Sequence, residues 1–236
     1  SFKLSLISNF TVLKFKEMVD VIAPAHLKIG AKALDDTSIN SDFKIYRKIY
    51  LFGCIAPDIN FIYPFHNIIC TPKRFQKRIM RMGKIKSKII RSFTLGVIMH
   101  YLCDYFCLAH NNNSYGAKHT LYERLMSHRI TTNSIPLECD MQSIKDYWKL
   151  AVEKYESGET TILDDIAVQH SIDCEEIFRI VKSMNDSYKE AVKSYINNGW
   201  YNDNKQMQFD VSWALFMCEK VSLLIYNNVG IRVASI

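Results

Sequence analysis

Two histidine–carboxylate pairs stand out in the segment TLGVIMHYLCDYFCLAHNNNSYGAKHTLYE, which covers residues 94–123. His100 is followed four residues later by Asp104, and His119 is followed four residues later by Glu123. On a helix, side chains four residues apart share a face, so each pair would present an imidazole and a carboxylate to one point. Imidazole nitrogens and carboxylate oxygens are common ligands of divalent transition metals. The spacing therefore predicts that both pairs bind metal.

The position of Asp104 supports this interpretation. It lies in the apolar run VIMHYLCDYFCLA, where a bare carboxylate is costly to bury unless a cation or strong hydrogen-bond donors compensate. A divalent metal would supply that compensation. The alternative is a satisfied polar group within a helical core. Two further histidines nearby, His66 and His110, favour the metal site over that alternative.

His110 imposes a geometric condition on any common site. At about 100° per residue, it falls on a different side of an ideal helix from His100 and Asp104. It can join them only if the helix bends or ends nearby. The polar sequence AHNNN after the apolar run is typical of a helix end, so we expect the helix to stop there.

The elements that must position these residues are predicted to be helices. The 236 residues include only 8 Gly and 5 Pro, which fits long helices better than a many-stranded sandwich or barrel. Apolar residues recur at helical spacing, and no alternating hairpin pattern, internal repeat or low-complexity linker stands out. We therefore predict an all-α fold with one domain over residues 1–236, in which residues 1–20 form a peripheral helix or an extension. The expected helices cover about 26–34, 42–56, 87–109, 118–128, 140–156, 173–197 and 205–228.

The basic charge of the chain is concentrated in one segment. The formal net charge is +6, yet nine Lys and Arg residues lie in KRFQKRIMRMGKIKSKIIR (73–91), which is broken at Gly83. No Asp or Glu occurs between Asp58 and Asp104. The segment is either a solvated helical face with its apolar residues turned inward, or a patch that attracts anionic lipid headgroups or nucleic-acid phosphates.

Other compositional features indicate the compartment. The seven cysteines form no CxxC pair and are typical of reduced thiols, with Cys107 expected in the core. No apolar run reaches the roughly 20 residues of a membrane-spanning helix. The N-terminal sequence does not have the pattern of a signal peptide. These features predict a cytoplasmic protein.

His128 and His170 have no matched partner and are expected to be surface or structural residues.

Several pieces of the sequence, in this order, resemble the zinc-dependent phospholipase C family of bacteria. Its superfamily also includes the P1-type single-strand nucleases. The resemblance covers roughly the N-terminal half of the chain, and any single piece is less specific than the ordered set. The matching pieces are AHLKIGAKAL (25–34), FGCIAPDINF (52–61), His66, LGVIMHYLCDYFCLAH (95–110) and HTLYE (119–123).

The resemblance implies a cluster of up to three zinc ions. Its ligands would be Asp58, His66, His100 and Asp104 for one ion, His110, His119 and Glu123 for a second, and His26 with a bridging Asp104 for a third. Secreted members complete the third site with an N-terminal tryptophan thirteen residues before the first ligand histidine, where this chain has Leu13. We therefore expect two zinc ions.

The chemistry of such a zinc cluster agrees with the resemblance and suggests roles for individual residues in catalysis and substrate binding. Asp58 would orient or deprotonate the attacking water, and Glu123 would add a role in proton transfer to its role as a ligand. Phe61, Tyr63 and Phe65 would line a pocket for the lipid glycerol or a cationic headgroup, or else form a packed loop.

The expected function is that of a zinc-dependent phosphodiester hydrolase of the phospholipase C type, acting on a phospholipid or a small phosphodiester. The alternatives are a P1-type nuclease acting on single-stranded nucleic acid, and a metal-binding relative without catalysis. His119-x-x-x-Glu123 favours the phospholipases, because the related nucleases end this motif with Asp. Residues 73–91 are the expected contact with an anionic membrane surface.

Overall fold

The computed structural model describes residues 24–37, 46–58, 71–82, 84–112, 117–139, 141–153, 174–193 and 200–234. The described residues are mostly helical and include no strand, which confirms the predicted all-α fold. Two 3-10 turns, η2 (Ala56–Asp58) and η4 (Trp200–Asn202), accompany the α-helices. The α-helices are α2 (Pro24–Asp36), α4 (Arg47–Ile55), α5 (Thr71–Met82), α6 (Lys88–Tyr105), α7 (Leu108–Asn111), α8 (Ala117–Thr131), α9 (Gln142–Glu153), α11 (Cys174–Val192) and α12 (Asn204–Ala234).

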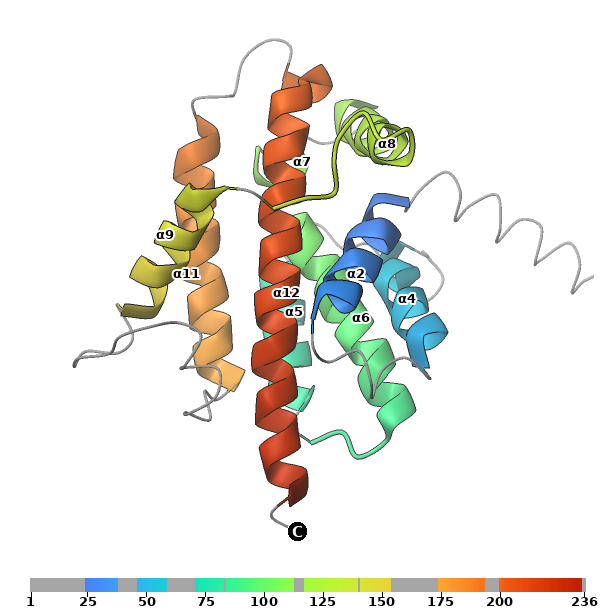
Figure 1. Ribbon diagram of the computed structural model, residues 1–236, viewed down its shortest axis with the longest axis vertical. Helices are drawn as coiled ribbons and strands as arrows, with labels where there is room; N and C mark the ends of the chain where they lie inside the picture. The colour runs from blue at the N-terminus through green and yellow to red at the C-terminus, as the bar shows by residue number, and fades with distance from the viewer. Residues whose placement is uncertain are drawn as a thin grey trace, which may run out of the picture.

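Helices α6 and α12 run through the middle of the molecule, and the other helices pack around them (Figure 1). Helices α2 and α4 lie on one side of this pair, and α9 and α11 lie on the other. Helix α5 contacts α6, α11 and α12. None of the described helices is long and apolar enough to cross a membrane.

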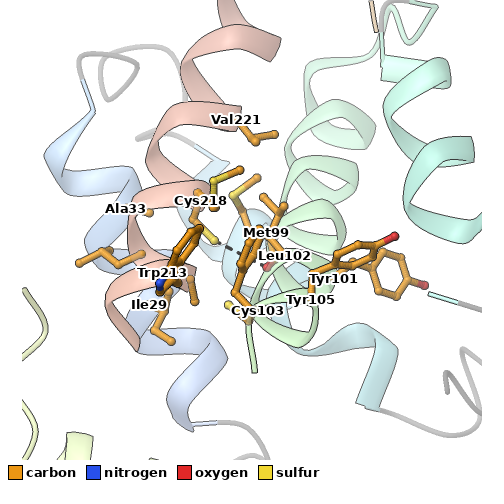
Figure 2. Close-up of a cluster of buried hydrophobic side chains, with 14 of the residues drawn as sticks. Ile29, Ala33, Met99, Tyr101, Leu102, Cys103, Tyr105, Trp213, Cys218 and Val221 are labelled. Atoms are coloured by element: carbon orange, nitrogen blue, oxygen red, sulfur yellow. Dashed lines mark hydrogen bonds between the residues drawn. The ribbon is translucent and has the colours of Figure 1, made fainter. Parts of the chain in front are cut away.

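The core between α6 and α12 is made of apolar and sulfur-containing side chains (Figure 2). Met99 and Cys103 of α6 face Trp213 and Cys218 of α12, and Ile29 of α2 closes the same cluster. All of these side chains are buried. Burial of this apolar surface is the main force that stabilises the arrangement. The predicted core position of Cys107 agrees with its burial.

Two glycines allow α4 and α6 to approach each other closely. A Cβ atom added to Gly53 would lie 2.3 Å from the Phe93 carbonyl oxygen, and one added to Gly96 would lie 2.0 Å from the Tyr50 carbonyl oxygen. Any larger residue would force the backbones apart. The close contact brings two predicted ligands together, because Asp58 ends the turn after α4 and His100 lies one turn after Gly96.

The chain after α4 differs from the prediction. The predicted helix 42–56 corresponds to α4, which ends at Ile55 and so before Pro57, as expected. The difference is the 3-10 turn η2, which was not predicted and which continues through Pro57 to Asp58. Residues 42–45 of that prediction lie outside the described residues. Proline is tolerated there because a turn of this kind can begin without its missing N–H donor.

The predicted helix 87–109 is also interrupted. Helix α6 ends at Tyr105, and Cys107 is extended, with φ −120° and ψ 127°, before α7 begins at Leu108. Side chains satisfy the backbone groups at this break. The Asn111 amide donates to the carbonyl oxygens of Tyr105 (2.8 Å) and Cys107 (2.9 Å). The Leu108 N–H donates to Asp210 Oδ2 at 2.7 Å. The break thus comes before the AHNNN sequence where we expected it.

Candidate metal centre

Six side chains from four helices form two groups of donors that could each hold a metal ion. The first group is His26, His100 and Asp104, and the second is His110, His119 and Glu123. Within each group, one donor atom per residue lies within 4.8 Å of the others. Helices α2 and α6 supply the first group, and α7 and α8 supply the second.

His26 lies between two carboxylates. Its Nδ1 is 3.4 Å from Asp58 Oδ2, and its Nε2 is 3.5 Å from Asp104 Oδ1. Helix α2 is held in place here by α8, because the Ala25 N–H donates to Ser127 Oγ at 3.3 Å. The ring of His26 meets that of His100 edge-on, with centroids 4.3 Å apart.

His100 is oriented by the backbone of α4. Its Nδ1 lies 2.9 Å from the Cys54 carbonyl oxygen, which can only accept, so Nδ1 carries the proton and donates. Nε2 then faces the site, 3.3 Å from Asp104 Oδ2 and 3.6 Å from Asp58 Oδ1. A histidine held by a carbonyl on one nitrogen is the usual arrangement for a metal ligand, because it fixes the tautomer and aims the other nitrogen.

The second group repeats this arrangement on α7 and α8. Glu123 Oε1 lies 3.0 Å from His110 Nε2 and 3.1 Å from His119 Nε2. The Nδ1 of His119 faces the Ala109 carbonyl oxygen at 3.4 Å, which again leaves Nε2 directed at the carboxylate. The rings of His110 and His119 meet edge-on, with centroids 4.5 Å apart.

The two groups are contiguous because His110 also reaches Asp104. His110 Nε2 is 3.2 Å from Asp104 Oδ1, the same oxygen that lies 3.5 Å from His26 Nε2, so one carboxylate oxygen contacts an imidazole of each group. The break between α6 and α7 makes this contact available by turning His110 toward the end of α6. The condition set by the sequence is therefore met, although the break lies four residues before His110.

The site has a buried floor and a more open rim. The side chains of His100 and Asp104 are 0% and 1% exposed, whereas those of Asp58 and Glu123 are 17% and 28% exposed. A small molecule reaching the centre from solvent would thus meet Asp58 and Glu123 before it met Asp104.

The electrostatics of the site show an excess of negative charge. Burial lowers the pKa of His26, but the hydrogen bond to Asp58 and the nearby carboxylates outweigh burial and raise its pKa to about 10. Burial alone would raise the pKa of Glu123, yet the hydrogen bonds from His110 and His119 lower it to about 2. In the metal-free chain, the proton held by His26 offsets part of the negative charge of Asp58 and Asp104.

These residues fit divalent zinc. Zinc prefers imidazole nitrogens and carboxylate oxygens, and each group offers two imidazoles and one carboxylate. Backbone carbonyls aim Nε2 of His100 and His119 into the centre. A bound cation would compensate the charge of the buried carboxylates in place of the proton on His26.

A buried carboxylate outside the two groups, Asp210 of α12, organises the second one. Its Oδ2 accepts from the Leu108 N–H at 2.7 Å and the Tyr122 hydroxyl at 2.6 Å. Its Oδ1 accepts from the Tyr188 hydroxyl at 2.7 Å and the Gln206 amide at 2.6 Å. Burial raises the pKa of Asp210 to about 6, and the four hydrogen bonds oppose that rise. Through these four hydrogen bonds, Asp210 connects α12 and α11 to α8 and to the start of α7.

Sequence reasoning missed Asp210. It lies in the apolar run MQFDVSWALFM, which carries the same signal as Asp104, a lone carboxylate among apolar residues. No histidine accompanies it at helical spacing, so the pattern that identified Asp104 did not extend to it.

The structure brings together every predicted ligand that it describes. They are His26, Asp58, His100, Asp104, His110, His119 and Glu123. Their roles as ligands remain predictions. His26 lies in one group with His100 and Asp104, and the assignment of these ligands to separate ions stays a prediction. His66, Phe61, Tyr63 and Phe65 lie outside the described residues, as does His170. His128 is exposed on α8, away from the two donor groups.

Comparisons with known proteins give one positive result. The family profile described as zinc dependent phospholipase C matches residues 25–202, which include all seven described candidate ligands. Comparisons with curated proteins and with solved structures return no match.

Proposed function

Since the chain belongs to the zinc-dependent phospholipase C family, we propose that it hydrolyses a phosphodiester bond of a phospholipid at the centre formed by its two donor groups. The observation that carries this proposal is that Asp104 Oδ1 lies close to both His26 Nε2 of the first group and His110 Nε2 of the second. A shared carboxylate between two imidazole-rich groups is suited to holding two divalent ions close together.

Zinc held by these residues would supply Lewis-acid chemistry, lowering the pKa of water and stabilising negative charge on phosphoryl oxygens. The chain's own residues provide the donor atoms and orient the reacting groups. His100 and Asp104 form the floor of the first group, and His26 adds a third donor. His110, His119 and Glu123 hold the second. The family's zinc dependence and the donor chemistry support this arrangement.

Asp58 is the proposed general base. It is more exposed than Asp104, so a water molecule can approach it from solvent. It also lies 3.4 Å from His26 Nδ1, which orients the carboxylate. Proton transfer requires the base to lie within hydrogen-bond distance of the water molecule. A carboxylate at the solvent-facing rim of the site can be approached that closely. Glu123, with a pKa of about 2 in the metal-free chain, stays ionised at neutral pH and is suited to a ligand role.

The test is an assay of the zinc-loaded chain on three substrates: short-chain phosphatidylcholine, bis-p-nitrophenyl phosphate and single-stranded DNA. We expect release of phosphocholine from the lipid, with loss of activity on chelation and recovery on adding zinc. His100→Ala should lower kcat/KM at least 100-fold, because it removes a donor from the buried floor. Asp186→Asn changes an exposed carboxylate of α11 and should leave activity unchanged.

Each other outcome contradicts the proposal in a distinct way. Cleavage of DNA with no phosphocholine release would identify the P1-type nuclease alternative. Full zinc loading with no hydrolysis of any of the three substrates would identify a metal-binding relative without catalysis.

A further inference from the structure

The turn between α5 and α6 presents an unusual combination of exposed side chains. Ile89 and Ile90, in the first turn of α6, are 51% and 56% exposed, and Met80 near the end of α5 is also exposed. Lys84, Lys86 and Lys88 lie between Met80 and the two isoleucines in the sequence and are exposed as well. We call these six residues the α5–α6 surface. It contains three of the five large hydrophobic side chains that are exposed in the described part of the chain.

Among the described residues, no acidic side chain neutralises the positive charge of this surface. Lys84, Lys86 and Lys88 form no ion pair with any described residue, and neither do the neighbouring exposed residues Lys77 and Arg81. No Asp or Glu occurs between Asp58 and Asp104. The basic residues thus leave a positive potential at this end of the molecule that attracts an anionic partner.

The turn is held in a fixed shape. The Arg91 side chain donates to the Ile85 carbonyl oxygen from Nη2 (2.6 Å) and Nε (3.2 Å). The Ser87 hydroxyl oxygen caps α6 by accepting from the Ile90 N–H at 3.4 Å. The backbone of Lys84 is tied to Arg81 by a 3.0 Å hydrogen bond. Exposure of the two isoleucines is therefore a feature of the folded turn itself.

We propose that the α5–α6 surface docks on the surface of an anionic lipid bilayer. Adjacent isoleucines at a helix start can enter the headgroup region while the flanking lysines contact lipid phosphates. This combination discriminates between the two anionic partners considered from the sequence. Nucleic acid is bound by basic residues together with stacking aromatic rings, and the apolar residues of this surface are aliphatic.

The position of the α5–α6 surface determines whether docking affects the metal centre. It lies at the lower end of α6 in Figure 1, whereas α7 and α8 lie at the upper end. Asp104 comes sixteen residues after Lys88, a separation of about 24 Å along the helix. Docking here holds the chain at a membrane without covering the metal centre. It therefore changes the membrane-bound fraction and leaves hydrolysis of a soluble substrate unchanged.

The experiment measures binding of the zinc-loaded chain to vesicles of phosphatidylcholine with about 30% phosphatidylglycerol, and to vesicles of phosphatidylcholine alone. The wild-type chain should bind the anionic vesicles at least tenfold more strongly. Lys84→Gln/Lys86→Gln/Lys88→Gln should weaken that binding about 100-fold, since each basic residue near the surface contributes about fivefold. Ile89→Ser/Ile90→Ser should weaken it at least tenfold, with the salt dependence retained.

Matched controls separate this surface from net charge and from folding. Lys145→Gln/Lys182→Gln/Lys205→Gln removes the same charge from exposed lysines of α9, α11 and α12, and should weaken binding far less. Leu150→Ser, at an equally exposed apolar residue, should have no effect. Equal binding of both vesicle types, equal loss in both triple variants, or binding of single-stranded DNA in place of vesicles would overturn the proposal. Zinc content and activity on soluble phosphodiester report on the proposed function separately.

Discussion

At the scale of single residues, the site depends on where each ring nitrogen points. His100 and His119 donate to backbone carbonyls from Nδ1, and so Nε2 is available to a metal. His26 differs, because both of its nitrogens face carboxylates. In the metal-free chain it is held as a cation between Asp58 and Asp104, and this charge contributes to stability.

The first prediction concerns that cation. The pKa of His26 is raised from 6.5 to about 10, so its stabilising contribution is complete below pH 6.5 and is lost as the pH rises through 10. The free energy of unfolding of the zinc-free chain should therefore fall by about 2 kcal/mol between pH 7 and pH 9. Urea denaturation at the two pH values measures it.

His26→Gln is the matched variant for this measurement, because it keeps a polar side chain but cannot become a cation. It should be less stable than the wild-type chain at pH 7, and its stability should change little between pH 7 and pH 9. A fall with pH of equal size in both proteins would contradict the assignment to His26.

At the scale of elements, the break between α6 and α7 decides the geometry of the second donor group. An unbroken helix through residue 109 would direct His110 away from Asp104. The break is held by the Asn111 side chain and by Asp210, which accepts from the Leu108 N–H. Asp210 also accepts from Tyr122, the residue before Glu123, and so positions α7 and α8 together.

The second prediction tests this role. Asp210→Asn keeps the volume but turns an amide N–H₂ toward one pair of donors, so the variant should lose about 3 kcal/mol of stability. Zinc should bind less tightly to the second group, with little change at the first. Cobalt titration followed by absorption spectroscopy resolves the two events, and thermal denaturation measures the stability.

Tyr188→Phe provides a graded comparison, since it removes one of the four donors to Asp210 and should cost about 1 kcal/mol. Two normal cobalt-binding steps in Asp210→Asn would show that Asp210 stabilises the fold without positioning the ligands.

The same elements show how far the sequence could predict the fold. The helical spacing of apolar residues identified α2, α6, α8, α9, α11 and α12, with the largest differences at the C-terminal ends of α11 and α12. It failed at residues 106 and 107, where the run YFCLA is apolar on both sides of the break. The interruption depends on the hydrogen bond from the Leu108 N–H to Asp210, about 100 residues later in the chain. No pattern in the sequence around residue 106 indicates that contact.

At the scale of the whole molecule, the donor groups join elements that are far apart in the sequence. His26 comes from α2, Asp58 from η2, Asp104 from α6, His110 from α7 and Glu123 from α8. Residue type and helical spacing were enough to predict the pairs His100/Asp104 and His119/Glu123 as ligands, whereas His26 and Asp58 were predicted only from the family resemblance. Spacing could not show that Asp58 lies near His100, because that depends on the close packing of α4 on α6 at Gly53 and Gly96.

The third prediction follows from this arrangement. Metal that binds the folded chain and not the unfolded one stabilises it by mass action, about 4 kcal/mol at a thousandfold excess over the dissociation constant. Removing zinc with a chelator should therefore lower Tm by about 5 °C or more, with recovery on adding zinc and none on adding magnesium. An unchanged Tm would show that no metal links these helices.

The central claim is that Asp104 joins two zinc-binding groups, and zinc analysis of protein purified without added zinc tests it most directly. The wild-type chain should contain at least two equivalents of zinc, and Asp104→Asn should lose zinc from both groups because its carboxylate lies against His26 and His110. Asp186→Asn, at an exposed position, should keep the full content. Less than one zinc per wild-type chain, or full zinc content in Asp104→Asn, would contradict the account.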